Sequence, residues 1–140
     1  MADIALTAAK IAVVDPDKAI IDTYIAGVTI TAGQFLYGII ASGKVGLAKE
    51  DTSATTSWVL GMALEAAGAG QPVQVLRQGK AYGFTLSGAY WLPLSLSDTA
   101  GALRDDYTTN VVARIAPVSD SDLTKVLMVD CGLGIVAGAA

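Results

Sequence analysis

Pro72-Val-Gln-Val-Leu-Arg-Gln-Gly-Lys-Ala-Tyr82 carries the pattern that decides the fold. A short run of apolar and β-branched residues is followed by Gln78-Gly79 and then by a second run that extends to Thr85. Short apolar runs bounded by Gly or Pro are typical of strands. Glycine also supplies the positive φ that a tight turn requires. We therefore predict a strand over 72–77, a hairpin turn at Gln78-Gly79, and a strand over 80–85.

The same pattern recurs along the whole chain of 140 residues, a length that fits one domain with its own core. It predicts strands over 11–14, 19–25, 28–30, 34–40, 44–48, 58–64, 72–77, 80–85, 89–94, 111–115 and 125–131. The expected fold is therefore all-β, a compact β-sandwich or β-barrel with extended apolar termini. The pattern leaves the choice between sandwich and barrel open.

A weak internal repeat divides this expected domain into two similar strand units, residues 27–79 and 82–132. In the first correspondence, Thr31-Ala-Gly-Gln-Phe-Leu36 matches Leu86-Ser-Gly-Ala-Tyr-Trp91. Further along, Ser42-Gly-Lys-Val45 matches Ala100-Gly-Ala-Leu103, and the apolar runs that start at 58 and 72 match those that start at 110 and 125. We expect an N-terminal arm and first strand over 1–18, one β domain over 19–132, and a C-terminal tail over 133–140.

Composition favours a protein that works by adhesion. The chain is 53% hydrophobic and only 16% charged, whereas typical domains are about 25% charged. A small domain cannot bury that much apolar surface alone, so part of it should contact partners. The net charge is −4 and the basic residues are dispersed, which argues against nucleic acid and anionic membranes as partners. No apolar run is long enough for a membrane span, and the first residues do not resemble a signal peptide.

Residues for catalysis or metal binding are scarce. Histidine is absent, which removes the commonest general base and metal ligand. The stretch Gly38-Ile-Ile-Ala-Ser-Gly-Lys-Val45 resembles a phosphate-binding loop, but Val45 replaces the required Ser or Thr, so a hairpin turn is favoured. The single cysteine, Cys131, cannot form an internal disulfide, favours an intracellular origin, and is interpreted as a buried apolar residue. We expect no catalytic residue, cofactor or metal.

The order of these motifs resembles one known family. Val28-Thr-Ile-Thr-Ala-Gly-Gln34 is followed by an apolar strand and Ser42-Gly-Lys-Val45. Then comes Trp58-Val-Leu-Gly-Met-Ala-Leu-Glu-Ala-Ala-Gly-Ala-Gly-Gln-Pro-Val-Gln-Val-Leu76. This order is similar to that of the capsid decoration, or cement, proteins of tailed phages, from about Ala19 to Gly132. The second unit departs from the pattern, because Ala113 stands where the first has Gly61.

The resemblance implies a structural virion protein, made in the host cytoplasm and located on the capsid exterior. Such proteins are β-rich, often homotrimeric, and stabilise the shell by bridging neighbouring major capsid subunits. The expected partners are therefore the major capsid protein and other copies of the chain, with no nucleic acid and no membrane. Candidate contacts are the apolar residues of the two chain ends and one aromatic pair: Ile4, Leu6, Ile11, Tyr90, Trp91, Leu133, Ile135 and Val136.

Two other functions remain open. A receptor- or glycan-binding module of a phage fibre would use Tyr90 or Trp91, which point to opposite faces if they lie in a strand, to stack on a sugar. A small hydrolase would need carboxylates that converge in a pocket, from among Asp105, Asp106, Asp120 and Asp122. These acids all lie in predicted turns, which makes the hydrolase the least favoured of the three.

Overall fold

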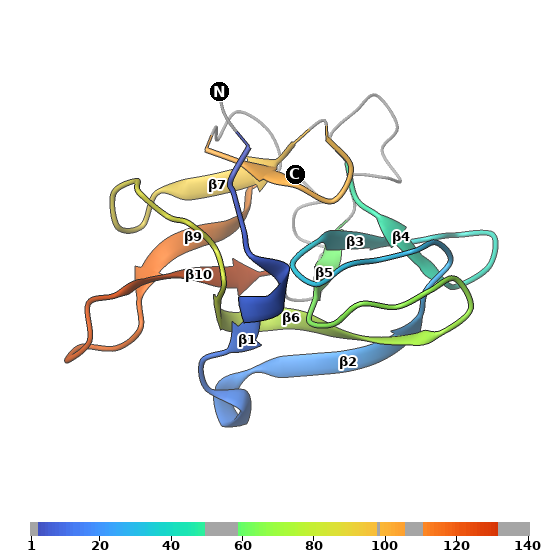
Figure 1. Ribbon diagram of the computed structural model, residues 1–140, viewed down its shortest axis with the longest axis horizontal. Coiled ribbons are helices and arrows are strands. Elements are labelled where there is room, and N and C mark those ends of the chain that lie inside the picture. Colours follow the sequence, from blue (N-terminus) through green and yellow to red (C-terminus); the bar gives the residue numbers. More distant parts are fainter. Residues whose placement is uncertain (1–2, 50–58, 98, 106–110, 132–140) are drawn as a thin grey trace.

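The computed structural model describes residues 3–49, 59–97, 99–105 and 111–131. Over these ranges the chain forms one curled antiparallel sheet without an α-helix, so the predicted all-β fold is confirmed (Figure 1). The strands are β1 (Ala12–Val13), β2 (Ile20–Ile25), β3 (Phe35–Gly38), β4 (Val45–Leu47), β5 (Val59–Ala63), β6 (Pro72–Tyr82), β7 (Pro93–Leu96), β8 (Leu103–Arg104), β9 (Val111–Pro117) and β10 (Lys125–Asp130). Two short 3-10 turns, η1 (Ala8–Lys10) and η2 (Pro16–Lys18), flank β1. No described helix is long and apolar enough to cross a membrane.

Strand β6 is the centre of the sheet. The strand order is β4-β3-β5-β6-β10-β9-β7-β8, and β1 and β2 pair with β6 outside this path. Ala81 pairs with Leu127 of β10 and with Val13 of β1, so β1 and β10 lie on opposite edges of β6. In Figure 1, β3, β4 and β5 lie on one side of the molecule and β7, β9 and β10 on the other. The two groups of strands are joined through β6.

The hairpin turn predicted at Gln78-Gly79 is wrong, because β6 runs through both residues without interruption. Gly79 pairs with Val129 of β10 as an ordinary member of the strand. Its φ is +145°, and a Cβ atom at this position would lie 3.0 Å from the Cβ of Ala19. Glycine is present here because another segment approaches the strand closely, and not because the chain reverses.

A bulge in β6 lets one strand serve both halves of the sheet. Ile20 pairs with Gln78 and Ile21 pairs with Leu76, so Arg77 is left over between them. Upstream of the bulge β6 pairs with β5, and downstream it pairs with β10. Because a bulge bends its strand and increases the local twist, it turns the sheet from one half towards the other.

The two strand units have the same pairing scheme. In the first, β3 pairs with β4 and β5, and β5 pairs with β6. In the second, β7 pairs with β8 and β9, and β9 pairs with β10. A register shift follows Leu36 in β3 and Leu94 in β7, which makes these two leucines equivalent. The glycines of the two short hairpins, Gly43 and Gly101, both have positive φ.

The structure corrects the match predicted between the aromatic parts of the two units. The sequence matched Phe35-Leu36 to Tyr90-Trp91, but Leu36 is equivalent to Leu94, three residues further on. Tyr90 and Trp91 therefore precede β7 and lie in a turn, so the strand predicted over 89–94 begins only at Pro93.

One predicted strand is absent, and one short strand has no predicted counterpart. Residues 28–30 form no strand and contribute one isolated bridge, between Ile30 and Ala67. Strand β8 was not predicted as a strand of its own, because two residues are too few for a period to be recognised.

Most of the core is shared by the two units. The larger apolar cluster contains Phe35 and Met62 from the first unit together with Leu94 and Ile115 from the second. A smaller cluster contains residues of the first unit together with Ala26, and none from the second unit. The sheet curls around the larger cluster like half of a barrel, so the described residues show neither a closed barrel nor two separate sheets. The main chain of Gly101 also bridges the units, since its carbonyl accepts from Phe35 N at 2.9 Å.

The N-terminal arm is bound to its own chain. Ile4 N donates to Leu103 O at 2.8 Å, and Thr7 N donates to Gly83 O at 2.8 Å. The Ser97 hydroxyl also donates to the Asp3 carboxylate at 2.6 Å. These bonds lay the arm along the edge of β8 and across the segment that follows β6.

Candidate interaction surface

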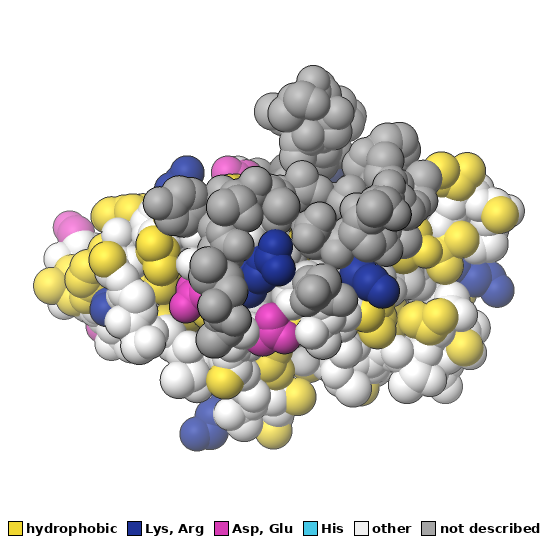
Figure 2. Space-filling model, turned by 90° about the horizontal axis from the view of Figure 1, so that it is seen from above, with side chains coloured by type: hydrophobic (Ala, Val, Ile, Leu, Met, Phe, Trp, Pro, Cys, Tyr) yellow, Lys and Arg dark blue, Asp and Glu magenta, His cyan; other side chains and the backbone are white. Residues whose placement is uncertain are grey.

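Large hydrophobic side chains are exposed at several separate places on the described surface. They are Ile20, Ile25, Val28, Ile40, Tyr82, Tyr90, Trp91, Val111 and Leu123. Figure 2 shows hydrophobic side chains towards both ends of the face it presents, with charged side chains between them. Single exposed apolar residues are common on any protein surface. A functional assignment therefore needs a second, independent property, and of this set Trp91 has one.

Trp91 is held in a backbone conformation that disfavours large side chains. Its φ is +68°, and no other described residue except glycine has a positive φ. The turn is fixed from both sides, because Trp91 N donates to Ile115 O at 2.6 Å and Arg114 Nη1 donates to Trp91 O at 3.0 Å. The residue is 53% exposed, so about half of this large apolar side chain is left in contact with solvent. A left-handed conformation costs a residue with a Cβ about 1–2 kcal/mol.

The equivalent turn of the first unit has glycine at this position. Gly33 has a φ of +91° and donates its N–H to Ala63 O at 2.8 Å, as Trp91 does to Ile115 O. The residue before it, Ala32, is small and buried and corresponds to Tyr90. The same backbone turn therefore carries Ala-Gly in one unit and Tyr-Trp in the other. Because the second unit has exposed aromatic side chains in a turn that strains a residue with a Cβ atom, we take this turn as the candidate site.

The neighbouring Tyr90 is also fixed in place. Its hydroxyl donates to Leu123 O, in the loop between β9 and β10. The Lys125 ammonium lies 5.2 Å from the centre of the Tyr90 ring and donates to Gly88 O. Such a cation–π contact is worth about 0.5–1 kcal/mol at an exposed site. Tyr90 remains 40% exposed and Leu123 62% exposed. We call Tyr90, Trp91 and Leu123 together the aromatic turn surface.

The other predicted contact residues divide into two groups. Ile4, Leu6 and Ile11 are half-buried against their own chain, and Ile4 and Ile11 pack on the larger apolar cluster. They can offer a partner only the part of each side chain that stays exposed. The remaining three, Leu133, Ile135 and Val136, lie outside the described residues.

Sequence reasoning did not single out Leu123, Arg114 or Lys125, which complete the site. An apolar residue within the polar stretch Ser119-Asp-Ser-Asp-Leu-Thr124 is the one signal that points to Leu123. Arg114 and Lys125 act through hydrogen bonds to main-chain carbonyls, which sequence does not reveal.

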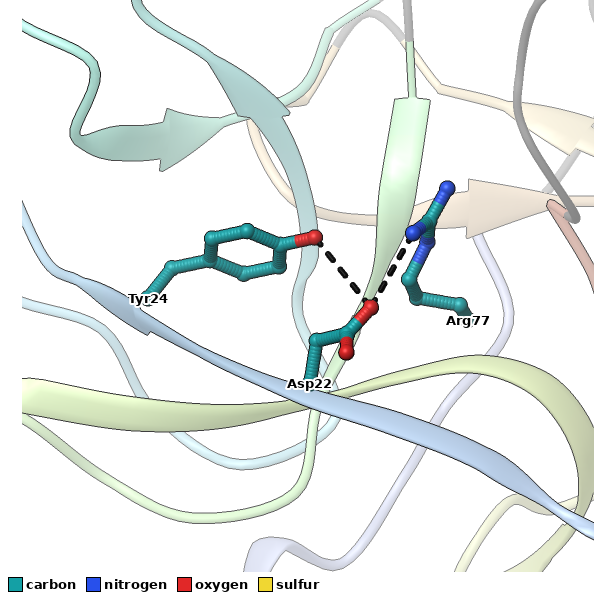
Figure 3. Close-up of polar contacts among 3 residues, drawn as sticks. All are labelled: Asp22, Tyr24 and Arg77. Carbon is teal, nitrogen blue, oxygen red and sulfur yellow. Dashed lines mark hydrogen bonds and ion pairs between the residues drawn. The ribbon is translucent and has the colours of Figure 1, made fainter.

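A polar cluster lies beside the bulge of β6. Figure 3 shows the Tyr24 hydroxyl and the Arg77 guanidinium both directed at one oxygen of the Asp22 carboxylate, at 3.3 Å and 3.0 Å. Burial raises the pKa of Tyr24, and the hydrogen bond to Asp22 raises the pKa of Arg77. The Asp22 carboxylate is paired with the Arg77 guanidinium, so the cluster ties β2 to β6.

The described acids that were considered for a hydrolase come from two loops, one after β8 and one between β9 and β10. Asp122 accepts a hydrogen bond from Thr124 N, and this bond lowers the pKa of its exposed carboxylate. Asp120 lies in the same turn, Asp105 lies after β8, and Asp106 is outside the described residues. Within the described ranges, no three His, Cys, Asp or Glu residues are arranged to hold a metal ion.

A hollow of about 660 Å³ opens on the sheet where β6 and β10 meet. Its charged lining residues have mixed sign, namely Asp15, Lys18, Lys80, Asp120 and Asp130. The Lys80 ammonium is directed at the carbonyls of Pro117 and Val118, and the Asp15 carboxylate accepts from Asp17 N. Since these two groups stabilise the walls of the hollow, the aromatic turn surface remains the stronger candidate.

The chain was compared with protein families, curated proteins and solved structures. No family model, no curated protein and no solved structure matches the chain.

Proposed function

We propose that this chain is a structural protein of a phage particle that binds the outer surface of the capsid and stabilises the shell by bridging neighbouring major capsid subunits. The observation that carries the proposal is Trp91, a half-exposed indole held by hydrogen bonds in a strained turn. Fixed, exposed aromatic side chains are typical of the energetic centres of protein interfaces. An interface is therefore the function that this residue supports best.

The composition of the whole chain supports the same proposal. Its high hydrophobic and low charged content is typical of a protein that covers part of its surface with partners. Its motifs resemble those of capsid decoration proteins, which are often trimers. A closed oligomer of identical chains on a lattice would engage many sites at once, so weak single contacts would add to firm attachment. Binding to the assembled shell would stabilise the shell by mass action.

The direct test is binding to empty shells of the phage that encodes the chain. The purified chain should co-sediment with these shells at a fixed ratio to the major capsid protein, and should raise the temperature at which they disrupt. Light scattering coupled to size exclusion gives the oligomeric state, for which the resemblance implies three copies. A monomer that leaves the shells unchanged would contradict the proposal.

A glycan-binding module of a fibre is the second candidate, favoured by the exposure of Tyr90 and Trp91. Screening the chain against an array of bacterial surface glycans separates the two functions. Specific glycan binding without shell binding would replace the capsid proposal with this one.

A further inference from the structure

The hollow where β6 and β10 meet lies on the outer face of the sheet. Val129 of β10 is fully buried, so its neighbours Met128 and Asp130 point to the opposite face of the strand. Ala81 of β6 is fully buried as well, which directs the preceding Lys80 to the same outer face, opposite Met128. These three side chains belong to the lining of the hollow, and every lining residue is within the described part of the chain.

The charged side chains around the hollow do not pair with one another. They are Asp15, Lys18, Lys80, Asp120 and Asp130. None of them forms an ion pair with a described residue. The Lys80 ammonium donates to two main-chain carbonyls, and Asp15 accepts from the main chain of its own turn. The side chains of Asp120, Asp130 and Lys18 have no hydrogen bond to a described residue, so two carboxylates and one ammonium are available to a ligand.

The lining of the hollow favours an organic cation. Carboxylates outnumber ammonium groups among the side chains that are available, which favours a positive ligand over a negative one. No three acidic residues of the described ranges are arranged to hold a metal ion, so the positive ligand must reach across a wider space. The volume of about 660 Å³ is that of a small-molecule site. Three half-buried apolar side chains, Val14, Val118 and Met128, also line it and offer contact to an aliphatic chain.

We propose that the hollow binds an ammonium or guanidinium group carried on an aliphatic chain. This is the chemistry of a lysine or arginine side chain of another protein, and also of a free polyamine. The cationic group pairs with the carboxylates of Asp120 and Asp130, and the aliphatic chain lies on Met128 and Val118. The inference does not depend on the proposed function, because the hollow and the aromatic turn surface have no residue in common.

Titration of the purified chain, followed by the amide signals in nitrogen-15 NMR spectra, tests the charge of the ligand. The probe is N-acetyl-arginine amide, and the controls are N-acetyl-norleucine amide, which is neutral, and N-acetyl-glutamate amide, which is negative. The arginine probe should shift the amide signals of Gly79, Asp120 and Asp130 with a dissociation constant of about 1 mM, the scale of a few charged hydrogen bonds. The two controls should leave these signals in place.

Two conservative substitutions test the carboxylates. Asp120→Asn and Asp130→Asn should each weaken binding of the arginine probe by about tenfold, because each removes one charged hydrogen-bond acceptor. The matched control is Asp17→Asn, which removes the same charge from the neighbouring turn η2 but does not line the hollow. This control should bind as the wild type does. All three positions are exposed, so the spectra of the variants should show the wild-type fold.

A titration with spermidine distinguishes the two sources of the cation. An affinity for spermidine at least tenfold higher than for the arginine probe identifies a free polyamine as the ligand. A similar or lower affinity identifies the basic side chain of another protein. Both results support a site for a cation on an aliphatic chain.

Three results would overturn the inference. They are equal shifts with the neutral or the negative control, no shift with either cation, and wild-type affinity in both the Asp120 and the Asp130 variant. Each would leave the proposed function standing, since that function is tested by binding to shells.

Discussion

Trp91 and Gly33 show how one backbone turn can serve two purposes. Both have positive φ and both donate to the corresponding carbonyl of the neighbouring strand. At Gly33 the missing side chain makes room for Leu6 and Ile11, whereas at Trp91 a large side chain projects into solvent. The first arrangement packs one part of the molecule on another, whereas the second leaves about half of a large apolar side chain exposed.

Substitutions at Trp91 and at Gly33 should therefore have unequal effects on the free energy of unfolding. Trp91→Gly relieves a strain of about 1–2 kcal/mol, adds about 0.5–1 kcal/mol of chain entropy cost, and loses the packing of the buried half of the indole, which is worth roughly 1–3 kcal/mol. Because these terms partly cancel, we expect its free energy of unfolding to fall by about 1 kcal/mol. Gly33→Ala adds the same strain and also pushes a methyl group against Leu6 and Ile11, so it should cost about 2 kcal/mol or more. Urea unfolding measures both, and a larger loss from Trp91→Gly would contradict this reading of the turn.

Cys131 provides a prediction about alkaline pH. Burial raises the pKa of its thiol to about 12, with a smaller contribution from Asp130, because a thiolate is poorly solvated there. The folded pKa lies above that of the unfolded chain, so this group does not affect stability below about pH 9. Between about pH 9 and 12 the unfolded chain loses its proton first, and stability should fall. The slope of stability against pH should be smaller in Cys131→Ala, and equal slopes would contradict the burial of the thiol.

At the scale of strands, the bulge in β6 explains why one strand can pair with both halves of the sheet. Gly61 of β5 lies against the bend, where a Cβ atom would overlap with the carbonyl oxygen of Leu76. Its counterpart in the second unit is Ala113, whose neighbour β10 has no corresponding register shift. Glycine is thus required only in the unit whose last strand bends.

Gly61→Ala should destabilise the protein by about 2 kcal/mol or more, since the main chain of β6 must move to admit the methyl group. The reverse change in the other unit, Ala113→Gly, should cost about 1 kcal/mol, the usual penalty for glycine inside a strand. Thermal unfolding followed by circular dichroism compares the two. A milder effect of Gly61→Ala than of Ala113→Gly would count against the close approach of β5 to the bulge.

The pattern of apolar and β-branched residues was sufficient to predict most strands, because runs such as those in β9 and β10 favour a strand over other secondary structures. It failed at Gly79, since glycine marks both turns and close approaches and only the position of Ala19 distinguishes them. It failed again at Tyr90-Trp91, where strong strand propensity is overridden by the hydrogen bond from Trp91 N to Ile115 O.

The candidate site was predicted in part. Tyr90 and Trp91 were named because exposed aromatic residues are enriched in interfaces. The reason offered, opposite faces of a strand, was wrong, because both residues lie in a turn. The contribution of Leu123 depends on the folding of the loop between β9 and β10 against Tyr90, which no local pattern predicts.

At the scale of the whole molecule, the two units form one cooperative structure. Their side chains mix in the larger apolar cluster, and β6 and β10 pair along four residues. The main chain of Gly101 also connects the second unit to β3 and to Ala48. Neither unit has a complete core without the other, so we expect a single unfolding transition.

Leu36→Ala and Leu94→Ala test this cooperativity with equivalent residues of the two units, both fully buried. Each should cost about 2–5 kcal/mol, the range for removing a buried leucine side chain. Both should lower the same single transition in a calorimetric scan. A variant that splits the scan into two transitions would show that the units unfold separately.

The repetition of one turn in two units has a consequence for how such a protein can change over generations. A protein with two equivalent turns needs only one of them to bind its own N-terminal arm. The other turn does not have to accommodate the arm, so a large side chain there can serve contact with another molecule. In this chain the turn that contacts the N-terminal arm has glycine, and the other turn has tryptophan.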